Sequence, residues 1–153
     1  MSAKKIIAIA NDHRGFPIKQ QLIPFLKEKG FEVIDFGCYS EESADYPDFM
    51  LKAAECVSQG RCDMAIGICY TGIGSSIVAN KVKGVRASLV HSVEEAKLTR
   101  AHNDSNMLIL GSGFVAPAII FSLVETWLDT PFEGGRHEQR VNKIKTYEQR
   151  RND

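Results

Sequence analysis

The chain has no long hydrophobic run. Among its 153 residues, no stretch of about 18 consecutive apolar residues could span a bilayer. The segment Met1–Ile7 carries two lysines but no apolar core of signal-peptide length. The 19 basic and 19 acidic residues balance, so no overall field attracts nucleic acid or a membrane surface. We therefore expect a cytoplasmic protein with neither nucleic acid nor membrane as a partner.

The sequence also lacks a recognisable zinc or disulfide pattern. Its cysteines are Cys38, Cys56, Cys62 and Cys69, whose spacings match no common zinc motif, and nothing indicates secretion. We expect four free thiols. Cys56 and Cys62 are interpreted as small core residues, whereas Cys69 stands apart because of the turn that surrounds it.

Five β-rich runs alternate with helical segments, and no hairpin signal separates them. The runs cover residues 5–10, 31–36, 64–68, 85–90 and 107–110, and the helical segments 16–29, 46–59, 75–80, 93–102 and 116–128. Parallel strands need such crossovers, so the pattern predicts a doubly wound, Rossmann-like α/β fold, a three-layer αβα sandwich around a five-stranded parallel sheet. Residues 1–131 form its single domain. Pro24 lies inside the first helical segment, where we expect a kink or a break.

The tail changes character at residue 132. Glu133-Gly134-Gly135 is interpreted as a hinge, and Arg136–Arg151 is strongly charged with few apolar positions. Such a helix buries little by itself. It is either a solvated terminal helix or, as we expect for residues 132–153, an arm of the same domain that packs on a partner subunit.

The most informative segment is Ile66–Ser76, an apolar strand that runs into a turn with a thiol, a hydroxyl and two glycines. The turn predicts an oxyanion cradle beside Cys69 and Thr71. Its backbone amides belong to Gly72, Ile73, Gly74 and Ser75. An enediolate would fit this cradle, and a helix N-terminus favours Cys69 as a general base. The alternatives are a buried, inert thiol and a dinucleotide site; the latter lacks the third glycine and follows the third strand.

Polar residues also follow the first predicted strand and the helical segment 93–102, and each of these two groups allows more than one interpretation. Asp12-His13 follows the first strand and could be a base with its orienting carboxylate, a phosphate contact or a helix cap. His102-Asn103-Asp104 closes a helix and offers more hydrogen-bonding groups than a C-cap needs, although a structural turn is equally consistent.

Three basic residues follow the glycine hinge on what we expect to be one helical face. They are Arg136, His137 and Arg140. Residues i and i+4 are neighbours on a helix, so the two guanidiniums could form a bidentate phosphate clamp. A solvated charged face is the competing interpretation.

Taken together, these residues resemble the ribose-5-phosphate isomerase B family, which also contains allose-6-phosphate and galactose-6-phosphate isomerases. The similarity covers nearly the whole chain. The matching segments, in the same order, are Asn11–Gly15, Asp45–Pro47, Cys69 with Thr71–Gly74, Ala79–Lys81, Arg100–Asp104, and Gly134–His137 with Arg140.

The resemblance implies roles for these positions. Cys69 resembles the base that moves a proton between C1 and C2 through a cis-enediolate, with Thr71 assisting and the amides of the turn holding the charge. Asp12, His102 and Asn103 would serve ring opening and sugar orientation. His13, Arg136 and Arg140 would hold the phosphate, and Tyr46 lies in a matching segment and is a further expected substrate contact. Tyr70 is expected to contact the substrate for its own reason, because a phenol at that position could narrow the pocket or add a hydroxyl contact.

The resemblance also implies no metal and no organic cofactor, and a homodimer, in some relatives a tetramer, whose sites draw on two chains. Two positions depart from the family pattern. Tyr70 stands where relatives commonly have glycine, and Gly113 where many carry an arginine that contacts the phosphate.

The hypothesis is therefore an aldose–ketose isomerase of a phosphorylated sugar, with ribose 5-phosphate and ribulose 5-phosphate as the first pair. Allose 6-phosphate, galactose 6-phosphate and tetrose phosphates are alternative substrates. A non-catalytic sugar-phosphate-binding module is the alternative from another class. A redox role for Cys69 is disfavoured, because no second cysteine lies at the spacing of a dithiol pair.

Overall fold

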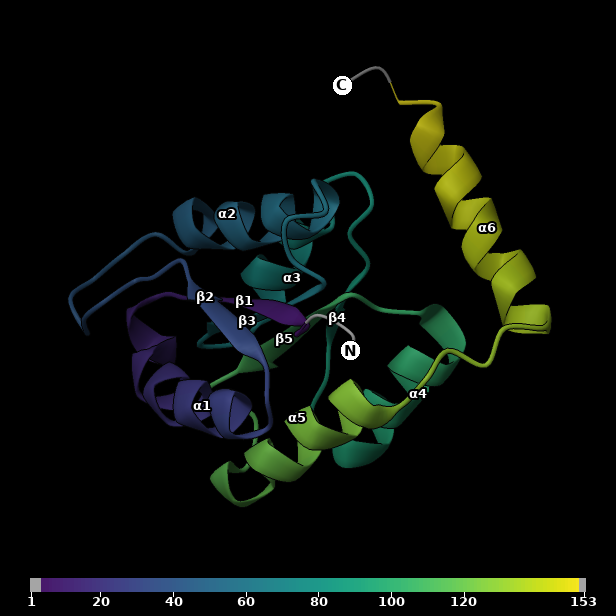
Figure 1. Ribbon diagram of the computed structural model, residues 1–153. Helices are drawn as coiled ribbons and strands as arrows, with labels where there is room; N and C mark the ends of the chain where they lie inside the picture. The colour runs from purple at the N-terminus through teal and green to yellow at the C-terminus, as the bar shows by residue number, and fades with distance from the viewer. Residues whose placement is uncertain (1–3, 152–153) are drawn as a thin grey trace.

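The computed structural model describes residues 4–151 and contains a parallel sheet (Figure 1). Its strands are β1 (Ile6–Asn11), β2 (Glu32–Asp35), β3 (Met64–Cys69), β4 (Ala87–Leu89) and β5 (Met107–Gly111). They are arranged in the order β2-β1-β3-β5-β4, and all four pairings are parallel. The predicted fold class is confirmed, with β4 shorter than expected.

Helices cover both faces of this sheet. They are α1 (Phe16–Glu28), α2 (Tyr46–Ser58), α3 (Ile73–Ala79), α4 (Val93–Asn103), α5 (Ile120–Asp129) and α6 (Arg136–Gln149). Short 3-10 turns, His13–Gly15 and Pro117–Ile119, lead into α1 and α5. The first helix does not break at Pro24, because Leu22 and Leu26 on either side are fully buried and hold the segment on the core.

Two apolar layers make up the core. One contains Ile66 and Ile68 of β3 with residues of α1 and α5, among them Trp127. The other packs α2 and α3 on small residues of the opposite face, such as Ala65. Gly67 shows how close that approach is, because a Cβ atom there would lie 2.7 Å from the sulfur of Met50.

The C-terminal helix α6 extends along the side of the molecule (Figure 1). It begins near the end of α4, where the N–H of Glu133 donates to the carbonyl of Ala101 at 3.0 Å. At its other end Glu148 accepts from the N–H of Gly84 at 2.7 Å. Ile144 and Tyr147 stay exposed, so this helix leaves apolar surface uncovered. No helix within residues 4–151 has the length and apolarity needed to cross a bilayer.

Candidate active site

Cys69 ends β3 at the carboxyl edge of the sheet, and its side chain is buried. Side chains alternate along a strand, so Cys69 points to the same side as Ala65, toward the layer of α2 and α3. Its carbonyl accepts the N–H of Ser112 at 2.8 Å, which fixes the turn to the segment after β5. Cys69 thus stands directly before the turn that leads into α3.

The four cysteines all lie in the described part of the chain, and each is a free thiol, as expected. Burial and, after it, the neighbouring Cys56 together raise the pKa of Cys62 to about 12, so this thiol stays protonated at neutral pH. Cys56 and Cys62 are core residues of the α2 layer. Neither belongs to the candidate site.

The backbone turn after Cys69 provides part of the predicted cradle. Helix α3 begins at Ile73, two residues earlier than expected, because Gly72 adopts a left-handed conformation with φ of 78°. The N–H of Ile73 is already bonded to Thr71 Oγ1 at 3.1 Å, which removes it from the predicted set of four donors. The amides of Gly74 and Ser75 have no acceptor among residues 4–151. The hydroxyl of Ser75 is also buried without a hydrogen-bond partner there.

Two residues after β1 have defined partners. Asp12 Oδ1 accepts from the N–H groups of Arg14 at 2.9 Å and Gly15 at 3.2 Å, so this carboxylate is a helix cap, one of the predicted alternatives. His13 Nδ1 accepts the N–H of Ala44 at 3.1 Å. A histidine that accepts through Nδ1 carries its proton on Nε2, which makes His13 a hydrogen-bond donor toward a ligand.

Tyr46 begins α2 and packs on Gly74. A Cβ atom on residue 74 would lie 2.4 Å from Tyr46 Cζ and 2.5 Å from its hydroxyl oxygen. Glycine is therefore required at position 74 for the phenol to reach this point. The arrangement places a phenol hydroxyl at the first turn of α3, beside the free amides.

The remaining predicted residues lie at the opposite edge of the sheet. Asn103 ends α4, and its carbonyl accepts from Nε of Arg86 at 3.2 Å, just before β4 begins. His102 precedes it on the same helix. Arg136 and Arg140 follow the segment that is bonded to the end of α4, and both are exposed. One chain thus does not bring His102, Asn103 and the two arginines to Cys69.

Asp104, the last residue of that helix-closing motif, has a structural role. It adopts a left-handed conformation with φ of 48°, and its carboxylate pairs with Arg100 at 2.9 Å and Arg86 at 3.4 Å. These bonds tie the end of α4 to the start of β4. His102 and Asn103 are left as the groups of the motif that could meet a ligand.

The imidazole of His137 is stacked on that of His102, with ring centroids 4.1 Å apart and planes 12° from parallel. His137 is buried, so it does not share the exposed face of Arg136 and Arg140 that the sequence predicted. Burial lowers its pKa, and the nearby His102 and Arg136 lower it further. Sequence reasoning placed His137 among the basic residues but not in the site.

His102, His137 and Glu133 are also the groups that could hold a metal ion, since one ligand atom from each lies within 4.8 Å of the others. However, the lone pairs of an imidazole lie in its plane. Two nearly parallel stacked rings cannot direct those lone pairs at one ion unless a ring rotates. The observed arrangement is that of a stacked pair rather than of a metal centre.

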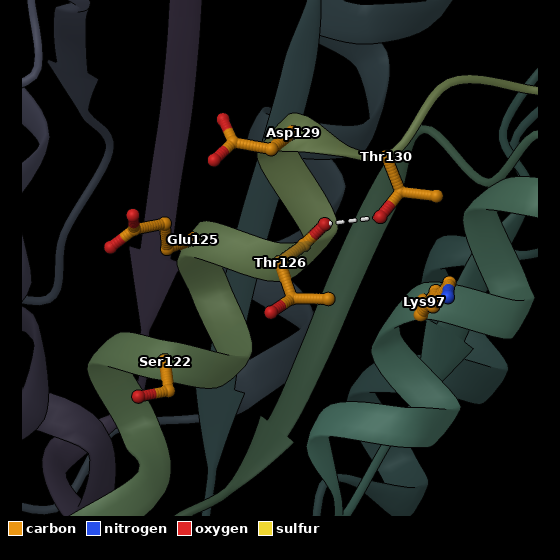
Figure 2. A pocket seen from close by; sticks show the side chains of 6 residues that line it. All are labelled: Lys97, Ser122, Glu125, Thr126, Asp129 and Thr130. Atoms are coloured by element: carbon orange, nitrogen blue, oxygen red, sulfur yellow. Dashed lines mark hydrogen bonds between the residues drawn. The ribbon is translucent and has the colours of Figure 1, made fainter.

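A hollow of about 460 Å³ lies between α4 and α5 (Figure 2). Glu125, Asp129 and Lys97 line it together with hydroxyl side chains, and Thr130 donates to the carbonyl of Thr126. Neither a thiol nor an imidazole lines this hollow. It is separate from the carboxyl edge that holds Cys69.

A buried thiol beside unpaired amides at the carboxyl edge of a parallel sheet defines a Rossmann-like protein with an anion-stabilising turn. The chain belongs to the Ribose/Galactose Isomerase family, whose model matches residues 7–144. It is 45% identical over 148 residues to ribose-5-phosphate isomerase B of Escherichia coli, covering 97% of this chain and 99% of the relative.

Solved structures give the same result. Ribose-5-phosphate isomerase B of Clostridium thermocellum superposes with a TM-score of 0.92 at 48% identity, covering 95% of this chain and 98% of that one. The Mycoplasma genitalium enzyme with bound ribulose-5-phosphate has a TM-score of 0.93 at 41% identity, covering 98% and 100%. The resemblance stated from the sequence motifs is confirmed.

Proposed function

We propose that this chain is an aldose–ketose isomerase that interconverts ribose 5-phosphate and ribulose 5-phosphate. The observation that carries the proposal is the free thiol of Cys69 beside the unpaired amides of Gly74 and Ser75. A thiolate can remove a proton from carbon, and amide donors stabilise the oxyanion that results. The relative with bound ribulose-5-phosphate supports this substrate pair.

In the proposed mechanism Cys69 takes the C2 proton of the open-chain aldose. The electron pair of that C–H bond forms the C1=C2 double bond, and the carbonyl π pair moves to O1, where the amides of Gly74 and Ser75 stabilise it. Thr71 accepts the Ile73 N–H through its oxygen, so its own proton is available to move between O2 and O1. The Cys69 thiol then returns its proton to C1, which gives the ketose.

The groups for ring opening and phosphate binding come from a second copy in this proposal. His102, Asn103, Arg136 and Arg140 lie at the edge opposite to Cys69, so each site of a homodimer would combine the two edges. Asp12 would help to orient the sugar and Nε2 of His13 would donate to the phosphate. The segment 132–153 would be the arm that reaches the partner. Further pairing to a tetramer and a cytoplasmic location stay predictions.

Exposed apolar side chains support an interface of this kind. Ile73 is 56% exposed, Ile77 58% and Leu98 40%. The first two project from α3 and the third from α4, on either side of the edge strand β4. A protein that stayed monomeric would leave these side chains in water.

Two measurements test the proposed function. Conversion of ribulose 5-phosphate in deuterium oxide should place label at C2 of the ribose 5-phosphate formed, because Cys69 would take a proton from C1 and return to C2 one that has exchanged with solvent; a binding module would leave the sugar unlabelled. The values of kcat/KM for pentose, tetrose and hexose phosphates, measured side by side, should be highest for ribose 5-phosphate. A clear preference for a hexose or tetrose phosphate would keep the reaction type and replace the substrate.

A further inference from the structure

Tyr70 occupies space that Gly113 leaves open. A Cβ atom on residue 113 would lie 2.3 Å from Tyr70 Cε1 and 2.6 Å from Cζ. The N–H of Gly113 donates to the Tyr70 carbonyl at 2.9 Å, and the Phe114 ring meets the Tyr70 ring edge-on at 5.7 Å. The two departures from the family pattern are therefore one structural feature, because the ring at position 70 requires glycine at position 113.

The guanidinium of Arg14 lies over the ring of Tyr70, with its Cζ 4.1 Å from the ring centroid. Contact with an aromatic face fixes a guanidinium and leaves N–H donors at its edge available. No ion pair joins Arg14 to a carboxylate among residues 4–151, and its side chain is exposed. The structure thus holds a charged donor group without an acceptor.

This charged group lies at the carboxyl edge of the sheet. Arg14 follows His13 directly, and Tyr70 follows Cys69. Arg14 and Tyr70 line a hollow of about 310 Å³, together with Ser112 of the segment after β5. Ser112 donates to the carbonyl of Cys69, so the guanidinium lines a hollow next to the turn that follows the thiol.

We propose that Arg14, positioned by the ring of Tyr70, binds the phosphate group of the substrate. The inference rests on the proposed function, which supplies a phosphorylated sugar as the ligand. Two parallel N–H groups of a guanidinium match two phosphate oxygens, which gives Arg14 a preference for phosphorylated over free sugars. Tyr70 is the positioning residue, and Gly113 is the residue that admits it.

The first test is Arg14→Met, with Arg61→Met as the matched control. Arg61 is an exposed arginine outside the carboxyl edge, and its Nε bonds only to Gln59. Arg14 supports the Asp12 cap through its backbone N–H, so the variant should fold, which its Tm checks. We expect the KM for ribose 5-phosphate to rise at least about tenfold with kcat within about twofold, since a hydrogen bond to a charged group is lost. Equal KM values for Arg14→Met and Arg61→Met would overturn the proposal.

The second test separates positioning from direct contact. Gly113→Ala displaces the Tyr70 ring, so its KM should rise as in Arg14→Met. The same substitution in a Tyr70→Gly background should add nothing, because no ring remains to be displaced. Tyr70→Phe keeps the ring under the guanidinium and should raise KM less than Tyr70→Gly does. Additive effects of the substitutions at 70 and 113 would refute the positioning role of Tyr70.

Calorimetric binding of inorganic phosphate and of ribose 5-phosphate distinguishes this inference from the proposed function. If the native protein isomerises no sugar phosphate but Arg14→Met still weakens phosphate binding about tenfold, the proposed function fails and the inference stands. If the native protein isomerises ribose 5-phosphate while Arg14→Met binds phosphate as tightly as native protein, the inference fails and the proposed function stands. Absence of any phosphate binding would refute the inference.

Discussion

Mixing two inactive variants should restore activity if each active site is built from two chains. His102 lies nine residues beyond Val93, the start of α4, which is about 14 Å along the helix axis from the carboxyl edge. A chain with Cys69→Ala still supplies His102, and a chain with His102→Ala still supplies Cys69. In random mixing about half of the dimers contain both variants, and one of their two sites is complete. About a quarter of the native activity should therefore return.

The assay compares ribose 5-phosphate turnover after the two variants are unfolded together in urea and refolded. Each variant refolded by itself gives the baseline. The matched control mixes Cys69→Ala with Thr71→Ala; both residues belong to the same half of the site, so no mixed dimer gains a complete site. The reasoning is refuted if the first mixture gains nothing over the mean of its baselines, or if the control mixture recovers equally well.

Three other outcomes concern single sites. Cys69→Ala should lower turnover at least about 10³-fold, because it removes the proposed base, while calorimetry should find ribulose 5-phosphate binding within about threefold of native. Gly74→Ala should raise KM about tenfold, because its Cβ would lie 2.4 Å from Tyr46 Cζ; recovery in Gly74→Ala/Tyr46→Ala would show that the ring is the cause. Burial and nearby positive groups lower the pKa of His137 below its ordinary 6.5. The unfolded chain then binds more protons, so the free energy of unfolding should be unaffected above about pH 6.5 and fall below it. In urea titrations, the difference in free energy of unfolding between native protein and His137→Phe should be constant above about pH 6.5 and should change only below it.

The order and type of the elements could be predicted from the sequence because each apolar run and each helical period is local. The ends of elements depended on backbone conformations that composition does not reveal. Gly72 in a left-handed conformation starts α3 two residues earlier than expected. Thr71 takes up one of the four amides predicted for the cradle. The contact of Tyr70 with Gly113 joins residues 43 positions apart, and no local pattern indicates it.

The basic residues at the start of α6 do not all lie on one face of the helix, although the sequence had predicted that they would. Arg136, His137 and Arg140 were expected on one face, yet His137 turns inward to stack on His102 while both arginines stay exposed. The spacing could not decide this, because it does not say which stripe of the helix meets α4. His137 and Val141, four residues apart and both buried, form that stripe.

The proposed division of the site between two chains is consistent with the winding of the sheet. A helix that connects parallel strands must return from the carboxyl edge to the amino edge, so the end of α4 lies far from the end of any strand in its own chain. If His102 and Asn103 at that end serve the same site as Cys69, they would meet it across an interface. A monomer would keep the thiol and its amides but would lack ring opening and the arginines of α6. Under this proposal assembly is a condition of catalysis, and the apolar side chains of Ile73 and Ile77 provide part of its driving force.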